Sequence, residues 1–189
     1  ERRLIAALQQ HRYGQHAHVD MKIDLKKLNT SAHASIPFDE TIDLADEKLY
    51  GAKPFQSPVH IKGVVSNESG VVRLAGSIET IYSTECARCL KPLEIPLSAE
   101  ADMMLSDDPE AEEEDDLFVL TSDSVDPADV LVPALILQVQ MTYLCKEDCK
   151  GLCPHCGADR NVTDCDCDKK QIDPRFAALR ALLDSDKGE

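Results

Sequence analysis

Apolar and polar residues alternate along the first half of the chain, and this alternation predicts β-strands. Residues 58–65 alternate loosely, residues 66–70 are typical of a turn, and residues 71–84 alternate more clearly. A period of two indicates a strand with one buried and one solvated face. The three segments therefore predict an antiparallel hairpin with a loop of about four or five residues. The buried face of its second strand should hold Val72, Leu74, Ile78 and Tyr82.

The clearest strand in the sequence covers residues 93–105. Polar residues such as Glu94 and Glu100 occupy one face, and apolar residues occupy the other. Pro96 lies on the polar face and indicates a sheet edge or a bulge, because proline cannot donate a backbone hydrogen bond. The apolar face consists of Leu93, Ile95, Leu97, Ala99, Ala101, Met103 and Leu105.

Two segments nearer the C-terminus have the spacing of amphipathic helices. The first should have Asp126 as its N-cap and Pro127 as its first residue, although Pro133 indicates a late start or a kink. The second should follow Asp173-Pro174, and we expect its apolar stripe to pack on the protein itself rather than on a partner. The apolar residues are Val130, Leu131, Ala134, Leu135, Leu137, Val139 and Met141 in the first, and Phe176, Leu179, Leu182 and Leu183 in the second.

The eight cysteines have the spacing of metal ligands. The unit from Cys86 to Cys89 falls in the short connection between two predicted strands, a usual position for a zinc knuckle. In Cys153-Pro-His-Cys156-Gly157 the proline rigidifies the turn, and the glycine permits a left-handed backbone that directs amides at sulfur. We therefore expect two zinc ions, bound by Cys86, Cys89, Cys145, Cys149, Cys153, Cys156, Cys165 and Cys167.

The sequence leaves two groupings of these cysteines open, and we favour the local one. Eight residues separate Cys156 from Cys165, so a site within the C-terminal tail closes at little entropic cost. The remaining four cysteines would then fasten the tail to the β-domain. The alternative is a simple ribbon that joins the first C-x-x-C unit to the second. The local grouping gives one site from Cys153, Cys156, Cys165 and Cys167 and another from Cys86, Cys89, Cys145 and Cys149.

The ligand set also predicts the class of site. Four thiolates on zinc leave no open coordination position, so we expect structural sites and no enzymatic activity. His155 lies inside the second C-x-x-C turn, a position that usually points away from the metal. Neither C-x-x-C unit precedes a helix of a βαβ unit, as it would in a thioredoxin-like protein. The sequence also contains no P-loop and no nucleophile elbow.

Charge limits the class of partner. The 189-residue chain has a formal net charge of −15, and two Zn²⁺ held by eight thiolates would add about −4. Phosphate backbones and anionic membranes repel such a protein, so we expect a basic protein partner and no membrane contact. We also expect no small-molecule substrate, in line with the missing catalytic motifs. The segment 145–184 is nearly neutral, and a weak, short-range contact with RNA is compatible with its charge.

The order of these features predicts an α+β protein, with an antiparallel β-sheet or partial barrel, a few helices and a C-terminal zinc-binding tail. Residues 1–20 would be a flexible extension or a non-native segment. Residues 21–125 would form the β-domain, with the zinc knuckle and an acidic loop at 106–116. Residues 126–189 would contain the helix, the cysteine-rich tail and the last helix. The chain shows no long apolar run and no secretory signal, so the cytoplasm is the expected location.

Four motifs follow one another along the chain: Cys86-Ala-Arg-Cys89-Leu90, Cys149-Lys-Gly-Leu-Cys153-Pro-His-Cys156-Gly157, Cys165-Asp-Cys167 and Ile172-Asp173-Pro174-Arg175. In this order and spacing they resemble the YceD-like family, the bacterial and plastid proteins named for accumulation of large-subunit ribosomal RNA. The similarity runs from about Met21 to the last helix, and it includes an acidic loop followed by an apolar helix. One departure is Asp159-Arg160-Asn161, where the family would have Asn-Leu-Asn.

The resemblance implies a non-enzymatic role in making or stabilising the 23S ribosomal RNA and the large subunit. Because the charge disfavours direct phosphate binding, we expect contact with a basic ribosomal protein or an assembly factor of the large subunit. A zinc-ribbon RNA-binding module is the alternative, and a redox-sensitive zinc switch is the third hypothesis.

Overall fold

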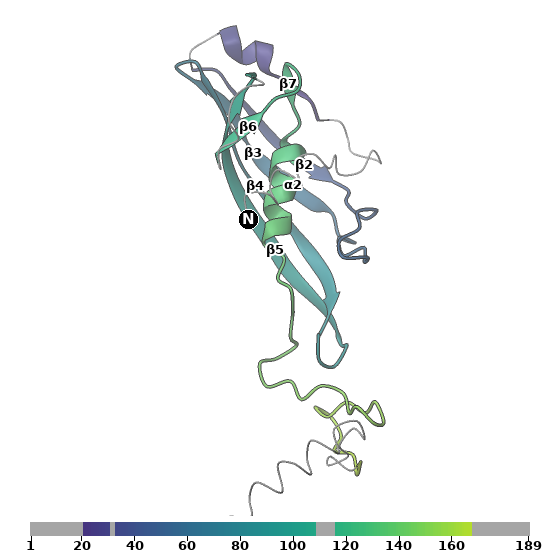
Figure 1. Ribbon diagram of the computed structural model, residues 1–189. Coiled ribbons are helices and arrows are strands. Elements are labelled where there is room, and N and C mark those ends of the chain that lie inside the picture. The colour runs from purple at the N-terminus through teal and green to yellow at the C-terminus, as the bar shows by residue number, and fades with distance from the viewer. Residues whose placement is uncertain (1–20, 31–32, 109–115, 168–189) are drawn as a thin grey trace, which may run out of the picture. The chain divides into compact units, whose positions relative to one another are not determined.

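A computed structural model describes residues 21–30, 33–108 and 116–167. Its main feature is a curled, five-stranded sheet, a half-barrel, with one α-helix against it (Figure 1). The strand order is β2-β3-β4-β5-β6; all neighbours are antiparallel except β6, which runs parallel to β5. The predicted α+β class and partial barrel are confirmed. The five strands are β2 (Ser35–Ile42), β3 (Val59–Glu68), β4 (Val71–Glu85), β5 (Pro92–Ser106) and β6 (Leu117–Val119).

Three smaller elements and the helix complete this part of the chain. A second sheet pairs β1 (Ile23–Asp24) with β7 (Ser124–Val125) in antiparallel fashion. The 3-10 helix η1 (Leu25–Thr30) follows β1, and Leu28 within it is fully buried. The helix α2 (Pro127–Leu137) contacts β3, β4 and β5.

The hairpin of β3 and β4 is confirmed, but its loop is shorter than predicted. Ser69 and Gly70 alone connect the strands, with φ angles of 59° and 96°. Positive φ at both central residues matches the right-handed twist of the flanking strands, so pairing continues to Glu68 and Val71. The side chain of Asn67 accepts a hydrogen bond from the amide of Gly70 at 2.8 Å, which fixes the turn.

The predicted alternation on β5 is confirmed, with acidic residues outward and apolar residues against the core. Pro96 lies where β5 is a sheet edge. β4 pairs with one side of β5 along its whole length, whereas on the other side β6 reaches only Met104–Ser106. Among the described strands nothing pairs with that second side at Pro96, so its missing amide hydrogen costs no ladder bond.

The helix α2 begins where the capping residues predict and not later. Asp126 has an extended backbone, and its carboxylate accepts a hydrogen bond from the amide of Ala128 at 2.9 Å. The predicted late start at Pro133 is wrong, because the helix runs through this proline. Burial of Leu131 and Leu135, both 0% exposed, offsets the missing hydrogen bond. The helix ends at Leu137, so Met141, which is 86% exposed, does not belong to its apolar face.

Removing this cap should measurably destabilise the protein. Asp126→Ala leaves the first-turn amide of Ala128 without its side-chain acceptor, and we expect a loss of about 1 kcal/mol in the free energy of unfolding. Urea denaturation followed by circular dichroism measures the difference. Asp126→Asn is the control, because asparagine caps nearly as well and should cost far less. An equal loss for both variants would contradict the capping role.

A pair of glycines lies at the centre of the sheet. Gly63 on β3 faces Gly76 on β4, and the ring of Phe38 on β2 lies close to both. A Cβ atom on Gly76 would stand 3.4 Å from a methyl group of Leu131 on α2. The two glycines therefore leave the space in which an aromatic ring and the helix pack on the sheet.

The chain divides into two compact units, and each is described by itself. The sheets and helices above belong to the first unit. Among described residues, the second contains Arg88–Leu90 and 146–167, which form turns and a single bridge between Leu152 and Asp159. Residues 1–20, most of the acidic loop and the predicted last helix lie outside the described residues, so these predictions and the domain boundaries stay predictions. No helix in the described part of the chain is long and apolar enough to cross a membrane.

Candidate metal centres

The first cysteine pair lies at the tip of the β4–β5 hairpin, as predicted. The amide of Cys86 donates to the carbonyl of Lys91 at 2.8 Å, which closes the turn between the strands. Leu90 completes the turn with a φ of 59°. Cys86 is 0% and Cys89 8% exposed, so both sulfurs are shielded from water.

Contacts with Tyr143 bring Cys145 towards Cys86. The ring of Tyr143 packs on that of Tyr82, with centroids 5.5 Å apart, and its carbonyl accepts a hydrogen bond from the amide of Ala87 at 2.9 Å. Tyr82 also packs edge-on against the buried ring of Phe55. The segment that carries Cys145 is thus held beside the knuckle by aromatic packing and a backbone hydrogen bond.

Hydrogen bonds to Arg88 hold Cys149 beside Cys89. The guanidinium of Arg88 donates to the carbonyl of Cys149 at 2.8 Å, and the carbonyl of Arg88 accepts from the amide of Leu152 at 3.1 Å. Gly151 permits this approach, because its φ is 69° and a Cβ atom there would stand 2.9 Å from the Arg88 carbonyl. These roles of Arg88 and Gly151 could not be predicted from a sequence pattern, since they depend on contacts between distant segments.

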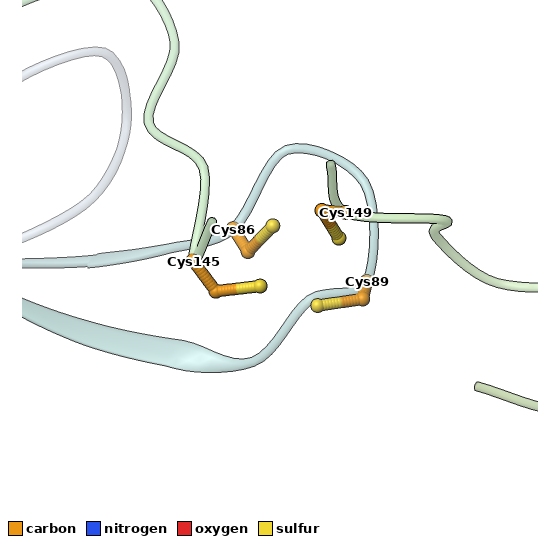
Figure 2. Close-up of side chains that lie close together, drawn as sticks. All are labelled: Cys86, Cys89, Cys145 and Cys149. Carbon is orange, nitrogen blue, oxygen red and sulfur yellow. The ribbon is translucent and has the colours of Figure 1, made fainter. Parts of the chain in front are cut away.

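Cys86, Cys89, Cys145 and Cys149 form the first group, and their sulfurs all lie within 4.8 Å of one another. Figure 2 shows the four sulfurs turned towards a common centre. A tetrahedral zinc ion with bonds of about 2.3 Å needs sulfurs about 3.8 Å apart, so a small inward movement would complete the site. The residues therefore fit a metal ion.

The second group is made by Cys153, Cys156, Cys165 and Cys167, whose sulfurs also lie within 4.8 Å of one another. The amide of Gly157 donates to the carbonyl of Cys153 at 2.9 Å, and Gly157 has the predicted left-handed backbone, with a φ of 73°. Cys156 is exposed, so this group is the more open of the two. Among the described residues, His155 is in neither group.

Hydrogen bonds within the second group give its thiols different pKa values. Backbone amides of Cys156 and His155 point at the sulfur of Cys153 and lower the pKa of its thiol to about 6. The thiol of Cys165 donates to Cys153, which raises the Cys165 pKa, and donation to Cys156 raises the pKa of Cys167 to about 12. These bonds favour the thiolate form of Cys153, and a cation entering the group would displace the protons that Cys165 and Cys167 donate.

The structure joins the cysteines in the grouping that local pairing predicts and not in that of a simple ribbon. Two closed groups of four thiolates could each hold an ion, and neither offers a position for an activated water. All-thiolate tetrahedral sets are typical of zinc. Metal binding by these residues stays a prediction.

Residues 74–183, more than half of the chain, match the family model described as "Large ribosomal RNA subunit accumulation protein YceD". The chain is 29% identical over 169 residues to protein YlbN of Bacillus subtilis, an alignment that covers 88% of this chain and 98% of the relative. It is 30% identical over 123 residues to protein Rv2926c of Mycobacterium tuberculosis, covering 63% of this chain and 59% of the relative.

A plant relative has a more informative name. The maize protein named "Large ribosomal RNA subunit accumulation protein YCED homolog 1, chloroplastic" is 26% identical over 155 residues. That alignment covers 65% of this chain and 52% of the maize protein, so the chain spans about half of that relative. No solved structure matches the chain.

Proposed function

Because the chain belongs to the YceD family of large ribosomal RNA subunit accumulation proteins, we propose that it is a non-enzymatic, zinc-binding factor in the biogenesis of the large ribosomal subunit. It would support the accumulation or processing of 23S ribosomal RNA by binding a basic ribosomal protein or an assembly factor. The names of the plant relatives and the two closed cysteine groups support this role.

The negative charge on the outward face of the sheet is the observation that favours a basic protein as the partner. Five exposed carboxylates lie on this face of β4 and β5, whereas Arg73 is the only basic residue on the two strands. The guanidinium of Arg73 is already paired with Asp102. Its Nε donates to Oδ1 of Asp102, and its Nη2 donates to Oδ2 at 3.0 Å. A surface of this sign repels phosphate and attracts a basic protein segment. The carboxylates are those of Glu79, Glu85, Glu94, Glu100 and Asp102.

The proposal predicts association with precursors of the large subunit. A tagged chain, expressed in bacteria and crosslinked, should sediment with those precursors in a sucrose gradient. Glu94→Gln combined with Glu100→Gln should weaken this association several-fold, because it removes two charges from the acidic face. Glu40→Gln combined with Asp107→Asn is the matched control, since it removes two exposed carboxylates outside that face.

Two outcomes would contradict the proposal in different ways. A chain that stays at the top of the gradient even after crosslinking does not act on the large subunit. Binding to bare 23S RNA fragments that falls steeply with salt, and that rises when acidic residues are neutralised, would favour the zinc-ribbon RNA-binding alternative.

A further inference from the structure

Asn161 makes a hydrogen bond that joins the two cysteine groups. It lies between Cys156 and Cys165, in the loop that connects the two halves of the second group. Its side-chain nitrogen Nδ2 is 3.4 Å from Sγ of Cys149, which belongs to the first group. Asn161, in the loop between two ligands of the second group, thus donates a hydrogen bond to the Cys149 sulfur of the first group.

Two further hydrogen bonds fix the orientation of the Asn161 side chain, and a third holds its backbone amide. Its Oδ1 accepts from the amide of Lys150 at 2.9 Å, so Nδ2 has to face the sulfur. Nδ2 and the backbone amide of Asn161 both donate to Oδ1 of Asp159, at 2.7 Å and 2.8 Å. With every polar atom of its amide engaged, Asn161 holds one conformation.

The loop around Asn161 is in turn held by the second group. The amide of Cys153 donates to the carbonyl of Ala158 at 2.8 Å, and the amide of Arg160 donates to the carbonyl of Gly151 at 3.0 Å. Since Cys156 precedes the loop and Cys165 ends it, a metal ion bound by both would fix its two ends. Loss of that ion would release them.

Donation of an N–H to a metal-bound thiolate stabilises its negative charge and fixes its direction. Removing such a partner of a ligand typically lowers metal affinity by about 10-fold to 100-fold. We propose that Asn161 is a positioning residue of the first metal centre, and that through it metal bound at the second group strengthens metal retention at the first. The inference rests on the metal binding proposed above, but not on the role in ribosome biogenesis.

Zinc release from the full-length, zinc-loaded chain to an excess of the chromogenic chelator 4-(2-pyridylazo)resorcinol tests the role of Asn161. Asn161→Asp keeps an oxygen for the amide of Lys150 but cannot donate to sulfur. We expect the purified variant to contain both ions and to release one of them about 10-fold to 100-fold faster than the wild type. Val162→Ala, in the same loop at an 82% exposed position, is the control and should release both at the wild-type rate.

Coupling between the groups is tested in a Cys153→Ser background, where only the first centre can be filled. Its remaining ion should leave faster than the corresponding ion of the wild type, and adding Asn161→Asp should change that rate little, because the loop is already released. In cobalt-loaded protein, Asn161→Asp should also shift the thiolate-to-metal charge-transfer band of one centre and not of the other.

Release of both ions at the wild-type rate from Asn161→Asp would overturn the positioning role. An unchanged release rate in Cys153→Ser would overturn the coupling. A purified chain with no bound zinc would remove the basis of both. Because these readouts measure metal retention, failure of this inference is distinct from failure to sediment with large-subunit precursors.

Discussion

Replacing Cys86 with serine should lower the zinc content of the purified chain from two ions to one. Its sulfur is one of four that converge in the first group, and it is completely buried, so water cannot substitute for it easily. A structural zinc site uses four protein ligands, so loss of one thiolate should lower the affinity enough to empty the site during purification. Metal analysis of the pure protein by mass spectrometry measures the stoichiometry.

The grouping of the ligands is tested by combining substitutions. Cys86→Ser and Cys145→Ser should each leave one ion, and the double variant should still contain one, because both residues belong to the same group. Cys86→Ser combined with Cys153→Ser should contain none. If Cys86→Ser and Cys153→Ser together retained one ion, the ribbon grouping would be right and the grouping in the structure wrong.

The grouping was predictable from the sequence because it depends on short loops and strand order. Cys86 and Cys89 sit between two strands with clear alternation, so their place at a hairpin tip followed from the pattern alone. The entropy of loop closure favoured pairing within the tail. The packing of Tyr143 on Tyr82, which brings Cys145 to the knuckle, could not be predicted, since it joins residues far apart in the sequence.

Short elements and side-chain directions were harder to predict. β6 has only three residues, too few to show a period. Its parallel pairing with β5 could not be predicted from the alternation of apolar and polar residues. The hairpin loop was predicted too long because Ser66 and Asn67 are residue types that favour turns, although both belong to β3. Asn161 was noted only as part of a departure from the family motif; its bond to Cys149 depends on a side-chain rotamer that no sequence pattern specifies.

Gly63→Ala should destabilise the first unit by about 3 kcal/mol or more. An added Cβ would overlap the backbone carbonyl of Ala75 and lie 2.6 Å from both the Cα of Gly76 and the ring of Phe38. Two of these three obstacles are backbone atoms of the neighbouring strand, which cannot move without breaking the β3–β4 ladder. Overpacking of this kind costs about 1 to 3 kcal/mol where side chains can adjust, and more where they cannot. Urea denaturation measures the loss.

Gly51→Ala is the matched control, because it adds the same methyl group where nothing lies within 4 Å. Its φ of 84° limits the expected cost to about 1 to 2 kcal/mol, from backbone conformation alone. Adding Phe38→Leu to Gly63→Ala should not restore stability, since the contacts with the neighbouring backbone remain. If Gly63→Ala cost no more than Gly51→Ala, or if Phe38→Leu rescued it fully, the close approach of β3 and β4 would not be the constraint that makes this position a glycine.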